Sequence, residues 1–199
     1  MYIIFEGIDT CGKTTQIELL ATEFKDVIVT KEPNSTILRE ILLSSSFKSK
    51  RGELLLFLAD RAEHYKRVIE PNRDKLVLSD RGFLSGIGYA LANGDFEFDY
   101  LVELNKLALY NNFPDFIIFF KTNIETLKNR MEAEDKKADG IELRGLEYLI
   151  KVQDNMEKSL KKLDIPYLTI DATKEIETIY IEISNQIYKL INQYISNIS

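Results

Sequence analysis

The hydrophobic residues of this chain gather in five short runs that predict β-strands, at Tyr2–Phe5, Val27–Thr30, Leu76–Ser79, Phe116–Phe120 and Tyr167–Ile170. Each run is nearly continuous rather than alternating, which is typical of parallel strands covered on both faces. Between the runs, apolar residues recur every three or four positions, as they do in amphipathic helices. Strands that alternate with helices predict an α/β fold: a five-stranded parallel sheet with helices on both faces, joined by right-handed crossovers.

A glycine-rich loop follows the first predicted strand, and Ile17, Leu20, Ala21 and Phe24 place an amphipathic helix directly after it. The loop fits the spacing G-x-x-x-x-G-K-[ST], in which backbone N–H groups cradle phosphates, the lysine reaches the terminal phosphates and the hydroxyl ligates Mg²⁺. A glycine turn that only joins a strand to a helix is the alternative, but all four fixed positions and both flanks agree with a phosphate site. The predicted nucleotide-binding residues here are Gly7, Ile8, Asp9, Thr10, Cys11, Gly12, Lys13, Thr14 and Thr15.

Two further polar clusters follow strands, at the sheet edge where ligands of such folds bind. Asp80 and Arg81 come after the third strand. A carboxylate there, downstream of a phosphate loop, is the usual second acidic group near the metal, and a guanidinium suits phosphate. An Asp–Arg pair that caps the next helix is the weaker alternative. The segment Lys31–Thr36 after the second strand is either part of the site or a plain helix-capping loop.

A long helix is predicted from about 52 to 69, with an apolar face and a neighbouring stripe formed by Phe57, Arg61 and His64. Periodicity alone favours a partly buried aromatic beside a solvated arginine in this stripe. His64 is the only histidine, so it is interpreted as structural and not as a metal ligand. Two more helices are predicted at 82–91, which carries Ser85 and Tyr89 on one side, and at 98–110, whose surface is unusually apolar.

The segment at about 131–145 is charged, has no apolar face and contains Asp139-Gly140, which suits a mobile lid or, equally, a solvated loop. Helices are also predicted from about 142 to 163 and after Asp171-Ala172-Thr173, where apolar residues from Ile176 to Tyr194 recur every three or four positions. The length of 199 residues suits a single domain.

The composition narrows the function further. The net charge of −6 argues against a nucleic-acid partner, so any anion must be held by a local site. One cysteine excludes an intrachain disulfide and fits a reducing compartment. With neither a secretory leader nor an apolar run of membrane length, the sequence predicts a cytoplasmic protein with no membrane partner.

The chain resembles the bacterial thymidylate kinase family in four segments, which are Phe5-Glu6-Gly7-x-Asp9-x-x-Gly12-Lys13-Thr14-Thr15-Gln16, Glu32-Pro33, Leu55-Leu56-Phe57-Leu58-Ala59-Asp60-Arg61-Ala62-Glu63-His64 and Asp80-Arg81. The phosphate loop is shared by many enzymes, whereas its combination with the Leu-Leu-Phe helix is far more specific. The resemblance implies a P-loop nucleoside monophosphate kinase domain that transfers the γ-phosphoryl group of ATP to dTMP, giving dTDP, with Mg²⁺ and as a homodimer.

The resemblance also implies roles for single residues. Phe57 would stack on thymine, Arg61 would bond a base carbonyl, Arg81 would hold the dTMP phosphate and Arg130 would stack on adenine. The implied sets are Asp9, Glu32, Pro33, Phe57, Arg61, Arg81, Ser85 and Tyr89 for dTMP; Arg130, Asp171, Ala172 and Thr173 with the phosphate loop for ATP; Thr14 and Asp80 for the metal; and Asp9, Lys13, Arg81, Lys136, Lys137 and Arg144 for catalysis.

Several positions depart from the family pattern. Two glycines after Pro33 are replaced by Asn34 and Ser35, and a common Arg, aromatic residue and Gln are replaced by Leu43, Gly82 and Ala90. The lid arginine is replaced by Gly140, and Thr10 offers no substitute in the phosphate loop. Lys136, Lys137 and Arg144 are therefore expected to supply the lid charge. If they do not, the neutralising group lies among Lys13, Arg39, Arg81 and Arg130.

Two alternative functions stay open at this stage. A deoxynucleoside kinase would need a carboxylate base near a 5′-hydroxyl, for which Glu6 or Glu32 could serve. A nucleotide-binding regulatory protein with weak catalysis would fit the missing lid arginine.

The apolar helix at 98–110 predicts an interface, which agrees with the implied homodimer.

Overall fold

Five parallel strands form the centre of the molecule in the order β2-β3-β1-β4-β5. The computed structural model describes residues 1–44, 47–133 and 145–196. The strands are β1 (Tyr2–Glu6), β2 (Ile28–Lys31), β3 (Val77–Asp80), β4 (Phe116–Lys121) and β5 (Tyr167–Asp171). The predicted α/β fold is confirmed, and each strand ends one residue later than predicted. Backbone pairing causes the difference, because the ladder continues through polar residues such as Lys31, which pairs with Asp80.

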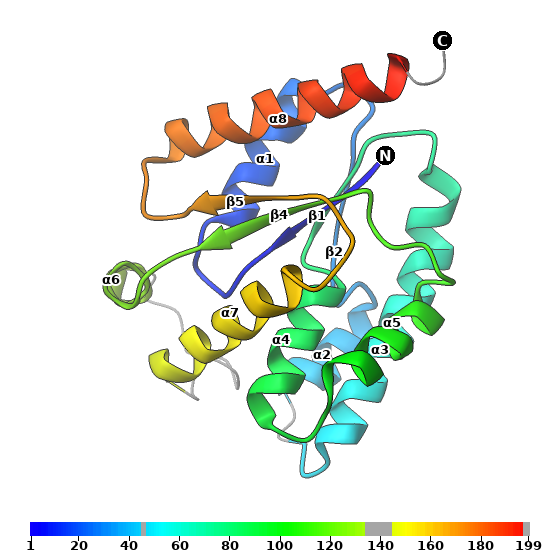
Figure 1. Ribbon diagram of the computed structural model, residues 1–199, viewed down its shortest axis with the longest axis vertical. Helices are drawn as coiled ribbons and strands as arrows, with labels where there is room; N and C mark the ends of the chain where they lie inside the picture. The colour runs from blue at the N-terminus through cyan, green and yellow to red at the C-terminus, as the bar shows by residue number, and fades with distance from the viewer. Residues whose placement is uncertain (45–46, 134–144, 197–199) are drawn as a thin grey trace.

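Helices cover both faces of this sheet (Figure 1). One face carries α1 (Lys13–Glu23) and α8 (Ile176–Ser196); the other carries α3 (Lys50–His64), α4 (Phe83–Asn93), α5 (Phe98–Ala108) and α7 (Leu146–Leu160). The remaining helices are α2 (Thr36–Ser44) and α6 (Ile124–Ala133). A π-helical turn at Tyr65–Ile69 and a 3₁₀ turn at Glu70–Asn72 continue α3. Among the described residues, we find no helix with the length and apolar character needed to cross a membrane.

Alternation along the central strands divides the core into two parts. In β1, Ile3 and Phe5 pack with α1 and α8, whereas Tyr2 and Ile4 pack with the helices of the opposite face. The edge strands are less covered than predicted, since Val29 of β2 is 49% exposed and Tyr167 of β5 is 41% exposed. Coverage on both faces therefore holds for β1, β3 and β4, which have neighbours on either side in the sheet.

The surface of α5 is less apolar than the sequence indicated. Leu101 and Ala108 of this helix are buried in the core, and the partly buried Phe98, Val102 and Leu104 pack against it. Its exposed large apolar side chains are Tyr100, at 57%, and Leu107, at 76%. The helix therefore has one ordinary buried face, which contacts α3 and α4. Exposed apolar side chains also occur at Leu55 of α3, which contacts α5, and at Ile37 of α2, which contacts α3.

The lid prediction falls mostly outside the described residues. Of the segment 131–145, the structure describes the end of α6 and Gly145, which directly precedes α7. Lys136, Lys137, Asp139, Gly140, Ile141, Glu142 and Arg144 lie outside the described residues, as does the start of the predicted helix 142–163.

Candidate active site

The carboxyl ends of three adjacent strands bring the polar clusters of the sequence together. Phe5 of β1 and Lys31 of β2 both pair with Asp80 of β3. The backbone N–H groups of Arg81 and Glu32 extend the ladder, bonding to the carbonyls of Phe5 at 2.9 Å and Asp80 at 3.0 Å. The loops that begin at Gly7, Glu32 and Arg81 therefore leave the same edge of the sheet, as parallel pairing requires.

The phosphate loop connects β1 to α1 by a tight turn. Gly7 has a φ of 147°, and a Cβ there would lie 2.8 Å from the carbonyl oxygen of Phe120, so only glycine fits against β4. Gly12, with a φ of 94°, precedes the first turn of α1. Lys13 is buried, and its Nζ donates to the carbonyl of Ile8 at 2.7 Å. The loop thus presents a helix N-terminus and an ammonium group to one cavity, an arrangement that binds anions.

The two predicted metal ligands lie next to each other. The Thr14 hydroxyl donates to Asp80 Oδ2 at 2.6 Å. These oxygens fit Mg²⁺, which binds few protein oxygens and completes its octahedron with phosphate oxygens and water. No cluster of three or more His, Cys, Asp or Glu residues suited to a metal occurs among the described residues.

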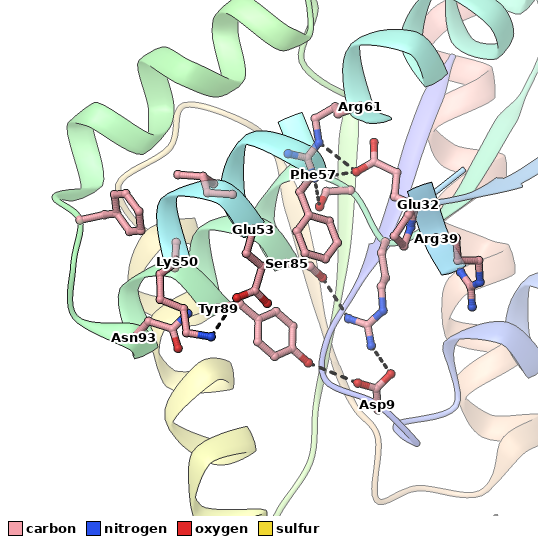
Figure 2. Close-up of a pocket in the computed structure, with 17 residues that line it drawn as sticks. Asp9, Glu32, Arg39, Lys50, Glu53, Phe57, Arg61, Ser85, Tyr89 and Asn93 are labelled. Atoms are coloured by element: carbon pink, nitrogen blue, oxygen red, sulfur yellow. Dashed lines mark hydrogen bonds and ion pairs between the residues drawn. The ribbon is translucent and has the colours of Figure 1, made fainter. Parts of the chain in front are cut away.

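Arg81 is the centre of a second group of polar side chains. Its backbone has a φ of 73°, an unfavourable conformation for a non-glycine residue that turns the chain from β3 towards α4. Its guanidinium donates to the Gly7 carbonyl at 3.0 Å, to Ser85 Oγ at 3.1 Å and to the Asp9 carboxylate. Tyr89 of α4 also donates to Asp9, at 3.2 Å, so this helix meets the phosphate loop directly through Tyr89 (Figure 2).

Ionisation within this group is fixed by its pairing. Burial by itself would raise the pKa of Asp9, but the Arg81 guanidinium and the Lys13 ammonium hold the pKa of that carboxyl below its usual value. Burial opposes the charge on Arg81, yet the neighbouring Asp9 carboxylate raises the pKa of Arg81 above its usual value. Burial and the adjacent Asp9 also raise the pKa of Tyr89. The group therefore holds one carboxylate and one guanidinium at neutral pH.

Arg61 is not solvated, contrary to what periodicity favoured. Its side chain is 2% exposed and bonds Glu32 Oε2 through Nε at 2.9 Å and through Nη2 at 2.6 Å. Nη1 donates to Asn105 and Nη2 also donates to the carbonyl of Gly82. A guanidinium has five N–H donors, so within the described part of the chain one N–H on Nη1 stays free.

Two buried carboxylates support this arrangement. Burial would raise the pKa of Glu32, but Arg61 and His64 together hold it below its usual value. His64 Nε2 lies 2.8 Å from Thr30 Oγ1, so the histidine joins α3 to β2. Its hydrogen bonds are to protein groups, in line with the structural interpretation. Glu6 accepts the backbone N–H groups of Leu84 and Ser85 at the start of α4, and burial raises its pKa.

Two cavities open at this edge of the sheet. All the residues that the resemblance assigned to dTMP line the first (Figure 2). The loop residues Asp9, Thr10, Cys11, Gly12, Lys13, Thr14 and Thr15, together with Asp80 and Arg130, line the second. Gly7 and Ile8 form the buried base of the loop. We refer to these as the acceptor cavity and the loop cavity.

The resemblance assigned Arg130, Asp171, Ala172 and Thr173 to adenine, and the structure places only part of this set at the loop cavity. Arg130 donates to the carbonyls of Thr10 at 3.3 Å and Ala172 at 2.7 Å, so its guanidinium bridges the two loops. Asp171 and Thr173 are exposed and bond to each other, and neither lines the cavity. Ile176 and Ile179 of α8 line it instead. Their helical spacing resembled ordinary core packing, so the sequence held no signal for this role.

Sequence reasoning also missed the residues that hold the site in place. Asp60 accepts the backbone N–H groups of Asn34 and Ser35, both at 2.7 Å, and thereby fixes the start of α2. Asn105 of α5 orients Arg61. The segment Lys31–Thr36 thus has both roles, because Ser35 caps α2 by accepting from the Leu38 N–H while Glu32 and Pro33 line the acceptor cavity. Pairing across elements leaves no local pattern that could have revealed these contacts.

Comparison with known proteins agrees with this geometry. The model of the family described as thymidylate kinase matches residues 5–183. A thymidylate kinase of Sulfurovum sp. (strain NBC37-1) is 64% identical over 184 residues, which cover 90% of this chain and 95% of that protein. A thymidylate kinase of Campylobacter concisus is 56% identical over 93% of this chain and 97% of its own, and one of Nautilia profundicola is 48% identical over 98% of both. The chain therefore belongs to the thymidylate kinase family.

Proposed function

We propose that this protein transfers the γ-phosphoryl group of ATP to dTMP, giving ADP and dTDP. The observation that carries the proposal is that the loop cavity and the acceptor cavity share Asp9, Glu32, Arg39 and Arg81 along their boundary. A phosphate donor over the loop and a monophosphate in the acceptor cavity would therefore meet at two guanidinium groups. Phosphoryl transfer requires this kind of positioning and charge neutralisation more than covalent chemistry.

The reaction needs no protein base. A phosphate oxygen of dTMP attacks the γ-phosphorus, a new P–O bond forms, and the bond to the β,γ-bridging oxygen breaks, leaving that electron pair on ADP. A phosphate monoester has a second pKa of about 6, so the attacking oxygen is already ionised at neutral pH. This suits a site whose carboxylates Glu6, Glu32 and Asp9 are all held by other groups.

Thr14 and Asp80 are the residues that we propose hold Mg²⁺. When bound, the ion would neutralise charge on the donor phosphates. The protein contributes the remaining positive groups: Lys13 and the loop N–H groups for the donor, Arg81 for the acceptor phosphate, and Arg130 as a flat surface for the donor base.

A nucleoside acceptor fits this site less well. Phosphorylating a 5′-hydroxyl would require a free carboxylate, whereas Glu6 is bonded to α4 and Glu32 to Arg61. Two guanidinium groups at the cavity boundary also favour an acceptor that already carries a phosphate.

A coupled assay of ADP release across nucleoside monophosphates and thymidine tests the proposal. We expect dTMP to give dTDP with the highest kcat/KM. Turnover of thymidine but not of dTMP would favour a deoxynucleoside kinase, and tight ATP binding without dTDP would indicate a regulatory protein.

Phe57 is proposed to select the base. Replacing Phe57 with alanine should raise the KM for dTMP about 5- to 100-fold and leave the KM for ATP nearly unchanged, because stacking on an aromatic is worth roughly 1–3 kcal/mol per base. Phe57 lines the acceptor cavity and not the loop cavity. Steady-state kinetics with each substrate varied in turn measure both constants. Equal losses for the two substrates would assign Phe57 to the fold instead of to base binding.

We infer that the protein works as a homodimer in the cytoplasm. A single cysteine, Cys11, which is buried as a free thiol in the phosphate loop, suits a reducing compartment. Exposed apolar side chains on the adjacent helices α2, α3 and α5 suit an interface, and they include Ile37, Leu55 and Leu107.

Leu107→Glu is expected to shift the protein from dimer to monomer on light scattering, because it places a charge within this apolar surface. Leu101, on the same helix, would not serve, since it is 0% exposed and a charge there would disrupt the core. Ile181→Glu on α8 is the matched control, with an apolar side chain that is also exposed. A wild-type protein that is monomeric at micromolar concentration would refute the dimer.

A further inference from the structure

The boundary between the two cavities is the place where a phosphoryl group would change partners. Asp9, Glu32, Arg39 and Arg81 line both cavities. They supply two carboxylates and two guanidinium groups, so the pairs they form determine which charge is left for a ligand.

Three of these four residues are already compensated by protein groups. Asp9 is paired with Arg81, and Glu32 is paired with Arg61. The Arg39 side chain makes no hydrogen bond or ion pair with any of the described residues, and Figure 2 shows it without a dashed contact while Asp9, Glu32, Arg61 and Ser85 all have one. Within the described parts of the chain, Arg39 is therefore the uncompensated charge at the boundary, and it is positive.

The backbone that carries Arg39 is held firmly. Arg39 is in the first turns of α2, and its N–H donates to the carbonyl of Ser35 at 2.8 Å. Ser35 is in turn fixed by Asp60, which is 1% exposed. Arg61, the residue after Asp60 in the sequence, is anchored by Glu32. A fixed helix start with an unpaired, partly buried guanidinium reduces the entropy lost when that group engages a ligand.

We propose that Arg39 is a further catalytic residue, which contacts the transferring phosphoryl group and the acceptor phosphate during transfer. This inference rests on the proposed dTMP kinase activity. A planar guanidinium can bond two oxygens at once and remains charged at all working pH values. Negative charge spreads over the equatorial oxygens in the transition state, and arginines in this position accelerate other phosphoryl transfers by about 10³- to 10⁵-fold.

The phosphate loop leaves room for such a group. Thr10 is neutral, so Lys13 is the one cation that the loop contributes. Arg81 uses its guanidinium to hold Asp9, Gly7 and Ser85 together, which leaves it only part of its donors for substrate. A second guanidinium at the boundary would compensate the part of the phosphate charge that Lys13 and Arg81 leave uncompensated.

The test compares Arg39→Ala and Arg39→Lys with Arg51→Ala, an exposed arginine of α3 that lines neither cavity. We expect Arg39→Ala to lower kcat for dTDP formation about 10²- to 10³-fold, with the KM for ATP changed by less than about threefold, since one transition-state donor is lost. Arg39→Lys should recover only part of the rate, because an ammonium cannot form the bidentate contact. Arg51→Ala should behave like wild type.

Chemical rescue separates a direct role from a structural one. Guanidinium or methylguanidinium ions at millimolar concentration should restore part of the kcat of Arg39→Ala and leave wild type and Arg51→Ala unchanged. Thermal melting should show an unchanged Tm for Arg39→Ala.

Three outcomes would overturn the inference: a kcat within threefold of wild type, a higher KM for ATP with kcat unchanged, or a low kcat without rescue that is accompanied by a lower Tm. In each of these, wild-type turnover of dTMP leaves the proposed function intact. Absence of dTDP formation by wild type would instead remove the proposed function and the inference with it.

Discussion

Replacing Lys13 with alanine is expected to lower kcat for dTMP phosphorylation by about 10³-fold or more. Lys13 is buried at the start of α1, and its ammonium lies against the phosphate loop, 2.7 Å from the Ile8 carbonyl. A charge in a water-excluded position interacts more strongly with a phosphoryl group than an exposed one does. Because negative charge on the transferring group shifts during reaction, the loss should be larger in the transition state than in ground-state binding.

The measurement combines turnover with circular dichroism, so that loss of activity can be separated from loss of fold. Lys25→Ala is the matched control, because Lys25 is an exposed lysine just beyond the end of α1. We expect the control to retain wild-type kinetics and both variants to retain their helical spectrum. Activity of Lys13→Ala above about a tenth of wild type would argue against the phosphate-loop assignment.

Local sequence patterns predicted the fold well where the residues of a single strand or helix determine its structure. Continuous apolar runs located all five strands, because strands buried on both faces need hydrophobic residues at every position. The same reasoning exaggerated the burial of β2 and β5, since a run such as Ile28–Thr30 has the same composition at the edge of a sheet as at its centre. Position within the sheet depends on topology, which no short segment encodes.

The site was predictable to the extent that its chemistry is local. The phosphate loop, Asp80 and Arg81 could be located because a turn and a strand end determine where they lie. Arg61 was predicted incorrectly by periodicity, since its partners Glu32 and Asn105 belong to β2 and α5 regions that are distant in sequence. The sequence offered Arg39 only as one of four candidate cations, and what distinguishes it is that it lines two cavities at once.

Replacing Arg61 with alanine is expected to lower the free energy of unfolding by about 3–5 kcal/mol, because it leaves a buried carboxylate without its partner. Glu32 is 5% exposed and its Oε2 accepts two of the Arg61 N–H groups. The double variant Glu32→Gln/Arg61→Met should lose less, since it buries no unpaired charge. Urea unfolding of the three proteins measures these differences, and a double variant less stable than Arg61→Ala would contradict the electrostatic explanation.

The pH dependence gives a sharper test of the same pair. In wild type the pKa of Glu32 is lowered, so its contribution to stability is complete above the unfolded value of about 4.3 and is lost as the pH falls through the folded pKa. In Arg61→Ala burial would raise the pKa of Glu32 above that value, and the destabilising effect then grows as the pH rises beyond about 4.3. The difference in Tm between wild type and Arg61→Ala should therefore widen between about pH 4 and pH 8, whereas that of the double variant should change little. A constant difference for Arg61→Ala would show that the lost contacts are packing contacts, and that Glu32 keeps its charge with His64 as a sufficient partner.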